Sequence, residues 1–209
     1  MTLQILGIPQ STYTRAACLA AEEKGIAYEL VPAPPHSEGI LAVHPLGKVP
    51  GLRHGDVELF ESSAVSRYID NAFDGPALYP ADAAGNAATE QWISVVNSHM
   101  DRTLIRQYLF AYLFPEGEGG APDQAAIDGM LPNVEKELGI LDKALADTGY
   151  LVGGQMTMAD LNLAPVLHYL TNTPEAGKII AQSAGLSKFL ENMRARPSFA
   201  ATEPPAQAA

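Results

Sequence analysis

The chain has 209 residues, of which 47% are hydrophobic and 18% are charged. These values are typical of globular proteins, and the length allows one large domain or two small ones with cores of their own. Lys and Arg total 13 against 24 Asp and Glu, which gives a net charge of −11. This acidic balance argues against a nucleic-acid partner and against docking on anionic lipid, because both need a basic surface.

Cysteine and histidine usage limits the chemistry further. Cys18 is the single cysteine, so neither an intrachain disulfide nor a cysteine cluster for a metal can form, and the five histidines show no metal-ligand spacing. The first twenty residues do not combine a basic start with an apolar run, and no stretch of about 18 apolar residues could span a membrane. We therefore expect a cytoplasmic protein that binds no metal and enters no membrane.

Residues 1–76 predict a small α/β domain. The expected strands cover residues 3–8, 26–31, 51–53 and 57–60, and the expected helices cover residues 13–24 and 62–73. A strand, a helix and a second strand in this order predict a parallel pair with a right-handed crossover. His54-Gly55-Asp56 between the last two strands predicts a tight hairpin.

Residues 74–87 change character, with Gly75, Pro76, Pro80, Ala81, Asp82 and Gly85, which indicates a linker between domains, and we place it at residues 77–86. The next region, residues 87–199, predicts an all-helical domain. Its expected helices cover residues 87–114, 123–147, 157–170 and 185–194. The last ten residues, 200–209, have little to bury, and we expect a disordered tail there.

Ser11 lies where the first strand ends and the first helix begins. The first N–H groups of a helix have no acceptor within it and carry partial positive charge, which favours an anion. The Ser11 hydroxyl can donate one more hydrogen bond to a thiolate there. The alternative is that Ser11 or Thr12 simply caps the helix, as Ser and Thr prefer to do.

The segment Gly47-Lys48-Val49-Pro50 directly precedes a predicted strand. A cis peptide between Val49 and Pro50 suits a tight turn into a strand and would leave the Val49 backbone groups free to pair with an extended peptide. An ordinary trans turn is the alternative. The sequence pattern leaves both open.

Glu61 and Ser62 begin the helix that follows the hairpin. A free carboxylate can rest against Ser62 and the helix N-terminus, while Glu61 can accept from an ammonium group. Together these groups suit the head of an α-amino acid, which carries both charges. A Ser- and Glu-rich helix start without a ligand is the alternative.

Two further features predict structure and no chemistry. Thr157 and Asp160 have the spacing of a capping box at the start of the helix over 157–170. Cys18 lies about two turns into its helix, far from the N-terminal end that would lower its pKa, which indicates a buried structural cysteine.

These sites, in this order, resemble the cytosolic glutathione transferase family, most closely the phi-like and related bacterial serine-type enzymes. The residues that carry the resemblance are Gly7–Ser11, Thr14–Gly25, His44–Pro50, Leu59–Ser63 and Thr157–Asp160, within a likeness that extends from about residue 3 to residue 199. The resemblance implies a thioredoxin-like N-terminal domain with the order βαβ-ββα, followed by an all-α helical bundle. It also implies a homodimer.

The resemblance further implies a role for each matching residue. Ser11 corresponds to the hydroxyl that hydrogen-bonds the glutathione sulfur. Lys48 and Val49 lie beside the cis-proline, where Val49 pairs with the cysteinyl backbone. Glu61 and Ser62 grip the γ-glutamyl head group. His36 falls near a position that reaches the glycyl carboxylate.

The implied reaction joins glutathione, as co-substrate, to an apolar small-molecule electrophile. There are two alternatives. The chain could be a relative that uses glutathione for isomerisation, dehalogenation or peroxide reduction, or it could be a non-catalytic module of the same fold. Leu104, Tyr108 and Tyr112 share one face of the long helix and would either line the second substrate's pocket or form inter-helix or dimer contacts. Arg102 and Arg106 would either favour an acidic substrate or balance Asp101.

Overall fold

The computed structural model describes residues 1–205 and divides the chain into two compact units. The first unit comprises Met1–Pro80 together with the residues from Arg194 onward, and the second comprises Ala81–Met193. The division after Pro80 falls inside the stretch that the sequence predicts as a linker. The C-terminal residues group with the α/β unit rather than with the helices that precede them.

The first unit is built on a sheet of four strands. They are β1 (Leu3–Gly7), β2 (Tyr28–Pro32), β3 (Gly51–His54) and β4 (Val57–Phe60). Their spatial order is β2-β1-β3-β4, in which β1 pairs parallel with β2 and antiparallel with β3, and β3 pairs antiparallel with β4. The predicted parallel pair and the predicted hairpin are therefore confirmed.

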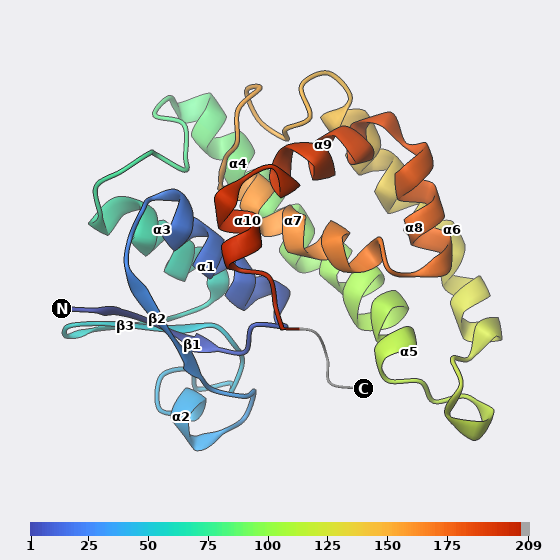
Figure 1. Ribbon diagram of the computed structural model, residues 1–209, viewed down its shortest axis with the longest axis horizontal. Helices are drawn as coiled ribbons and strands as arrows, with labels where there is room; N and C mark the ends of the chain where they lie inside the picture. Colours follow the sequence, from blue (N-terminus) through green and yellow to red (C-terminus); the bar gives the residue numbers. More distant parts are fainter. Residues whose placement is uncertain (206–209) are drawn as a thin grey trace. The chain divides into compact units, whose positions relative to one another are not determined.

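Helices cover both faces of this sheet. They are α1 (Thr12–Glu23), α2 (Glu38–Leu41) and α3 (Ser62–Ala72), and a further helix, α10 (Pro197–Ala201), packs on α1. Figure 1 shows α1 and α3 on one face of the sheet and α2 on the other. Under α2, Ile40 packs with Leu6, Ala33 and Val43, all of them buried. The two apolar faces of the strands are thus both enclosed.

The helix α10 corrects the expectation of disorder from residue 200. Pro197 occupies its first turn, a position where the missing N–H costs nothing. Phe199 and Thr202 are both buried, and the Thr202 hydroxyl accepts a hydrogen bond from Arg15 on α1 at 3.4 Å. Residues 200–202 are therefore ordered by packing on α1, while residues 206–209 of the predicted tail lie outside the described residues.

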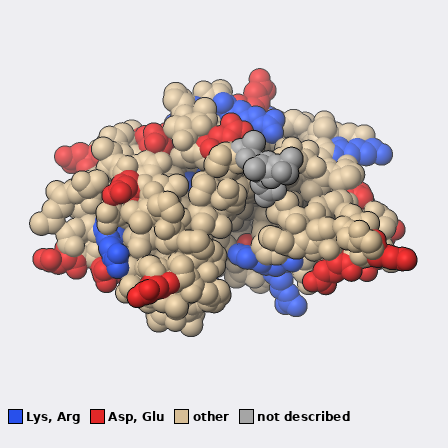
Figure 2. All heavy atoms as spheres, turned by 60° about the horizontal axis from the view of Figure 1, so that its bottom comes forward, with Lys and Arg blue, Asp and Glu red and all other residues tan. Residues whose placement is uncertain are grey.

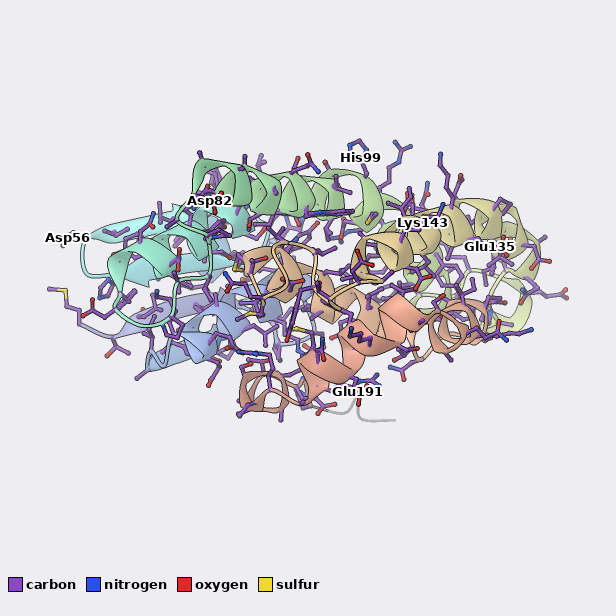
Figure 3. The ribbon with its side chains drawn as sticks, turned by 90° about the horizontal axis from the view of Figure 1, so that it is seen from above. Asp56, Asp82, His99, Glu135, Lys143 and Glu191 are labelled. Carbon is purple, nitrogen blue, oxygen red and sulfur yellow. The ribbon has the colours of Figure 1, made fainter. Side chains whose placement is uncertain are left out.

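The second unit consists of helices joined by turns. They are α4 (Ala83–Val95), η1 (Val96–Leu109), α5 (Phe110–Leu113), η2 (Glu118–Gly120), α6 (Gln124–Leu145), α7 (Met158–Leu170), α8 (Pro174–Gln182) and α9 (Ala184–Arg194). The helix α4 begins four residues before the predicted Ala87, because Asp82 caps it by accepting from the Gly85 N–H at 2.8 Å. Asp82 is labelled at the start of α4 in Figure 3, and Asp56 marks the tip of the β3–β4 hairpin.

The helix α7 forms the centre of this unit. Most of its residues are buried, and it packs against α4 and η1, while α6 packs on η1 and α8 packs on α6. At its start the Thr157 N–H and hydroxyl both donate to Asp160, at 2.7 and 2.9 Å, so the predicted capping box is confirmed. The sequence interpretation missed α8, whose nine residues begin at Pro174.

Between α4 and α5 the long helix adopts the wider π-helical geometry over Val96–Leu109. Asp101 and Arg106 lie five positions apart there, which is close to one turn of such a helix, and their side chains pair at 3.0 Å. Of the two interpretations of Arg106, the structure therefore supports the one in which it balances Asp101.

Candidate active site

The sheet topology gathers the predicted site residues of the first unit at one end of the sheet. Because Leu6 of β1 pairs with Gly51 of β3, and Gly51 pairs with Phe60 of β4, the end of β1, the start of β3 and the end of β4 are neighbours. The end of β2 joins them, since Gly7 pairs with Pro32. The segments that follow or precede these strand ends carry all six predicted residues: Ser11, His36, Lys48, Val49, Glu61 and Ser62.

Ser11 is the N-cap residue of α1. Its backbone is extended, with φ −71° and ψ 126°, and its Oγ accepts from the Thr14 N–H at 3.3 Å. Accepting this bond uses a lone pair of the hydroxyl and leaves its proton available to a further acceptor. The capping role and the donor role that the sequence interpretation set against each other are therefore chemically compatible in the same side chain.

The peptide bond between Val49 and Pro50 is cis, as the sequence interpretation suggested. Val49 is half-buried, whereas Lys48 is exposed. Gly47 precedes them with φ 65°, and a Cβ atom at Gly47 would lie 2.5 Å from His36 Nδ1. Glycine is required here both for the backbone conformation and for the close approach of His36, whose N–H donates to the Gly47 carbonyl oxygen at 2.8 Å.

Two non-glycine residues within residues 1–205 have positive φ, and both are predicted site residues: His36 at 62° and Glu61 at 69°. Such conformations cost on the order of 1–3 kcal/mol each and persist only where surrounding contacts enforce them. Backbone strain of this kind concentrates at binding and active sites. At Glu61 it turns the chain from β4 into α3 and leaves the side chain 63% exposed.

His44 is a residue of this region to which the sequence interpretation gave no role. Its side chain is 2% exposed and its Nδ1 accepts from the Leu46 N–H at 3.2 Å. Its Nε2 lies 3.9 Å from Glu61 Oε1, and its ring centroid is 4.8 Å from that of Phe60. The motif around residues 44–50 includes His44, but a lone histidine in a sequence does not reveal that its ring is buried against another motif.

Cys18 is only 3% exposed, which confirms it as a buried cysteine. Burial raises the pKa of its thiol to about 12, although a hydrogen bond with Tyr28 acts in the opposite direction. A thiol of this pKa carries almost no thiolate at neutral pH. Cys18 is therefore no candidate for nucleophilic chemistry.

In the second unit, Leu104 and Tyr108 are completely buried among the helices. The Tyr108 hydroxyl donates to Glu175 at 2.8 Å, and the Tyr112 hydroxyl donates to the same Glu175 oxygen at 2.5 Å. Leu104, Tyr108 and Tyr112 thus share a helix face that forms contacts between helices. For the fully buried Leu104 and Tyr108, this supports the interpretation as inter-helix contacts over the one as a substrate-pocket lining.

The second unit also has a groove of about 370 Å³ between the α4–η1 segment and α6. Trp92, Met100 and Glu137 contribute to its lining, and burial raises the pKa of the Glu137 carboxyl. His99 also lines the groove, and Figure 3 shows this side chain projecting outward from η1. The groove is lined by residues of the second unit alone.

Comparison with known proteins covers almost the whole chain. Residues 6–77 match the family described as "Glutathione S-transferase, N-terminal domain", and residues 124–192 match "Glutathione S-transferase, C-terminal domain". Glutathione S-transferase 3 of Zea mays is 32% identical over 210 residues, which is 96% of this chain and 92% of the maize protein. The chain belongs to the glutathione S-transferase family.

Solved structures of the family agree with this assignment. Glutathione transferase F7 from Populus trichocarpa superposes with a TM-score of 0.85 at 29% identity, over 96% of this chain and 97% of the poplar chain. A theta-class glutathione S-transferase from Xanthomonas axonopodis pv. citri, solved with glutathione bound, has a TM-score of 0.83 at 28% identity, over 99% of both chains. The predicted fold class, the enzyme class and glutathione as its co-substrate are thereby confirmed.

Three further features of this glutathione transferase concern membrane-spanning helices, metal-binding groups and surface charge. Within residues 1–205, no helix is both long and apolar enough to cross a membrane, and no group of three or more His, Cys, Asp or Glu side chains has a geometry suited to a metal ion. On the face drawn in Figure 2, basic side chains lie in separate small groups among the acidic ones.

Proposed function

We propose that Ser11 activates the thiol of glutathione by donating its hydroxyl hydrogen bond to the sulfur as a thiolate, at the N-terminus of α1. The observation that carries this proposal is the position of Ser11: it is the N-cap of a twelve-residue helix, and its Oγ already accepts from the Thr14 N–H. An oxygen that accepts a hydrogen bond becomes a better donor, because linked hydrogen bonds polarise one another.

The energetics are sufficient for this role. A free cysteine thiol has a pKa of about 8.5, and lowering it by about two units requires selective stabilisation of the anion by about 2.7 kcal/mol. One charge-assisted hydrogen bond supplies about 1.5–3 kcal/mol, and a helix N-terminus adds about 0.3–1 kcal/mol. Ser11 then acts as a donor and not as a nucleophile, so it needs no neighbouring base.

The remaining residues suit the rest of the tripeptide. The carboxylate of Glu61 receives the γ-glutamyl ammonium, while Ser62 at the start of α3 receives the adjacent carboxylate. The Val49 backbone pairs with the cysteinyl residue. In this proposal His36 and the exposed Lys48 receive the glycyl carboxylate, which needs a positive or hydrogen-bonding partner.

The decisive experiment is Ser11→Ala, assayed for conjugation of glutathione to an aryl halide and for the ultraviolet absorbance of bound thiolate against pH. We expect kcat at pH 6.5 to fall about 100-fold, as a loss of about 2.7 kcal/mol implies. The apparent pKa of the bound thiol should return toward about 8.5. Retention on immobilised glutathione should persist.

Ser11→Thr is the matched control, because threonine keeps both the hydroxyl and the capping oxygen. It should retain most of the activity that Ser11→Ala loses. Full activity in Ser11→Ala would contradict the proposal, and Thr12→Val and Tyr13→Phe would then show which neighbouring hydroxyl carries the role.

We further propose that the second substrate is an apolar electrophile, that the enzyme is cytoplasmic and that it is a homodimer, all supported by its family. An exposed apolar side chain, Leu46 at 60%, is available for a subunit contact in the first unit. Sedimentation at micromolar concentration tests the dimer, cell fractionation tests the location, and a panel of aryl halides and alkyl epoxides tests the substrate class.

A further inference from the structure

We infer that His44 is a positioning residue for glutathione binding, which holds the Glu61 carboxylate in place relative to the turn that carries Lys48 and Val49. This inference rests on the proposed function of Glu61 as the acceptor of the γ-glutamyl ammonium. His44 itself touches no substrate in this scheme. It acts through the two segments that its ring contacts.

The hydrogen bonding of His44 determines which of its two ring nitrogens carries the proton. Nδ1 accepts from the Leu46 N–H at 3.2 Å, so this nitrogen carries the lone pair of the ring. In a neutral imidazole the proton then resides on Nε2. The side chain of His44 is only 2% exposed, so its ring is held by protein contacts and is largely shielded from water.

The N–H side of the ring faces Glu61. The distance from Nε2 to Glu61 Oε1 is 3.9 Å, which is longer than a direct hydrogen bond but short for the attraction between an N–H dipole and a carboxylate. Because the contact is not a hydrogen bond, both oxygens of Glu61 keep their lone pairs for an incoming ammonium. His44 thus orients the carboxylate without occupying it.

The backbone around Glu61 explains why such support is needed. Glu61 has φ 69° and ψ 120°, and its side chain is 63% exposed, so little besides His44 limits where the carboxylate points. Phe60, the residue before it, packs against the His44 ring in a tilted arrangement, with the two ring centroids 4.8 Å apart. One buried ring therefore contacts the end of β4, the start of α3 and, through Leu46, the turn that leads to the cis peptide.

Two substitutions separate the two halves of this contact. His44→Asn places an amide oxygen near the position of Nδ1 and keeps an acceptor for the Leu46 N–H, but it is too short to reach Glu61. His44→Gln extends an amide N–H toward Glu61 but loses the acceptor for Leu46. Calorimetric titration with glutathione and kcat at saturating glutathione should be measured for both.

For His44→Asn we expect the Kd of glutathione to rise about 2- to 10-fold, as loss of one moderate polar contact implies, with kcat at saturation unchanged. His44→Gln should bind glutathione more tightly than His44→Asn, even if its melting temperature is lower. Wild-type affinity in His44→Asn, or the opposite order of the two variants, would overturn the inference.

A double-mutant cycle tests whether His44 acts through Glu61. In a Glu61→Gln background, His44→Asn should change the Kd by less than about 2-fold, because the carboxylate that His44 orients is absent. An equal effect in both backgrounds would show a general structural role and overturn the inference. His54→Asn is the control: His54 lies on β3, hydrogen-bonds the Tyr68 hydroxyl at 2.9 Å, and should leave the Kd unchanged.

The same titration separates this inference from the proposed function. If the wild-type protein does not bind glutathione, the assignment of Glu61 fails and the role of His44 fails with it. If the wild type binds and His44→Asn binds equally well, only the inference about His44 is wrong.

Discussion

The guanidinium of Arg15 lies over the ring of Phe199, 4.2 Å from its centroid, and its Nη2 donates to the Phe199 carbonyl oxygen at 3.0 Å. Its Nε also donates to the Thr202 hydroxyl. Arg15 is 1% exposed and belongs to α1, the helix that begins just after Ser11. Residues more than 180 positions apart in the sequence thus fix the C-terminal segment to the helix on which the proposed thiolate site depends.

Arg15→Met tests this connection. Methionine fills a similar volume but leaves the Phe199 carbonyl without its donor in a buried place, so the free energy of unfolding should fall by about 2–4 kcal/mol. Urea unfolding, followed by circular dichroism, gives this value. Arg102→Met, at an exposed arginine of η1, is the control and should change it by less than about 0.5 kcal/mol. Equal midpoints for the two variants would disprove the role of Arg15.

The ion pair between Glu23 and Arg196 predicts a pH dependence of stability. Burial by itself would raise the pKa of Glu23, but hydrogen bonds from Arg196, at 2.6 and 2.5 Å, and from Ser198 outweigh it and hold the pKa below its usual value. A carboxyl with a lowered pKa in the folded state contributes stability above its unfolded pKa and loses it as the pH falls through the folded value.

Glu23→Gln should therefore cost about 1 kcal/mol at pH 7 and progressively less below about pH 4.5, where the unfolded carboxyl takes up its proton. Unfolding midpoints of both proteins between pH 3 and pH 7 measure the difference. A difference that stays constant over this range would show that the pair does not depend on the Glu23 charge.

The thiol of Cys18 should be inert in the folded protein. Its pKa of about 12 and its burial both prevent attack on a disulfide reagent. At pH 8 we expect no reaction with dithiobis(nitrobenzoate) over an hour, and one reacting thiol per chain after denaturation in guanidinium. Rapid reaction of the native protein would mean that α1 opens locally, and Cys18→Ala should then abolish the signal.

The capping box at α7 predicts two graded losses of stability. Thr157→Ala removes one side-chain bond to Asp160 and should cost on the order of 1 kcal/mol. Asp160→Ala should cost more, about 2–4 kcal/mol, because the N–H groups of Leu151 and Thr157 lose their buried acceptor. Thermal unfolding of the two variants checks the order. A larger loss in Thr157→Ala would contradict it.

Local patterns predicted much of the fold because their causes are local. The His54-Gly55-Asp56 turn between two short strands indicated the β3–β4 hairpin, and Thr157 with Asp160 indicated the start of α7. Predictions failed where the structure of a segment depends on contacts that its sequence pattern does not reveal. The tail from residue 200 contains mainly small and polar residues, yet Thr202 is buried and accepts a hydrogen bond from Arg15. The start of α4 was misplaced because Gly85 and Asp82 were interpreted as linker, although Asp82 is its cap.

By itself the amino-acid order determined the four strands and the helices α1 and α3 of the first unit, the family and the six residues proposed for glutathione, since these depend on spacing along the chain. Tertiary structure decided which residues meet. Antiparallel pairing of β3 with both β1 and β4 brings the segments of Ser11, Val49 and Glu61 to one end of the sheet, and only this pairing buries the His44 ring against Glu61. Contacts between residues far apart in sequence depend on packing, which no local pattern encodes.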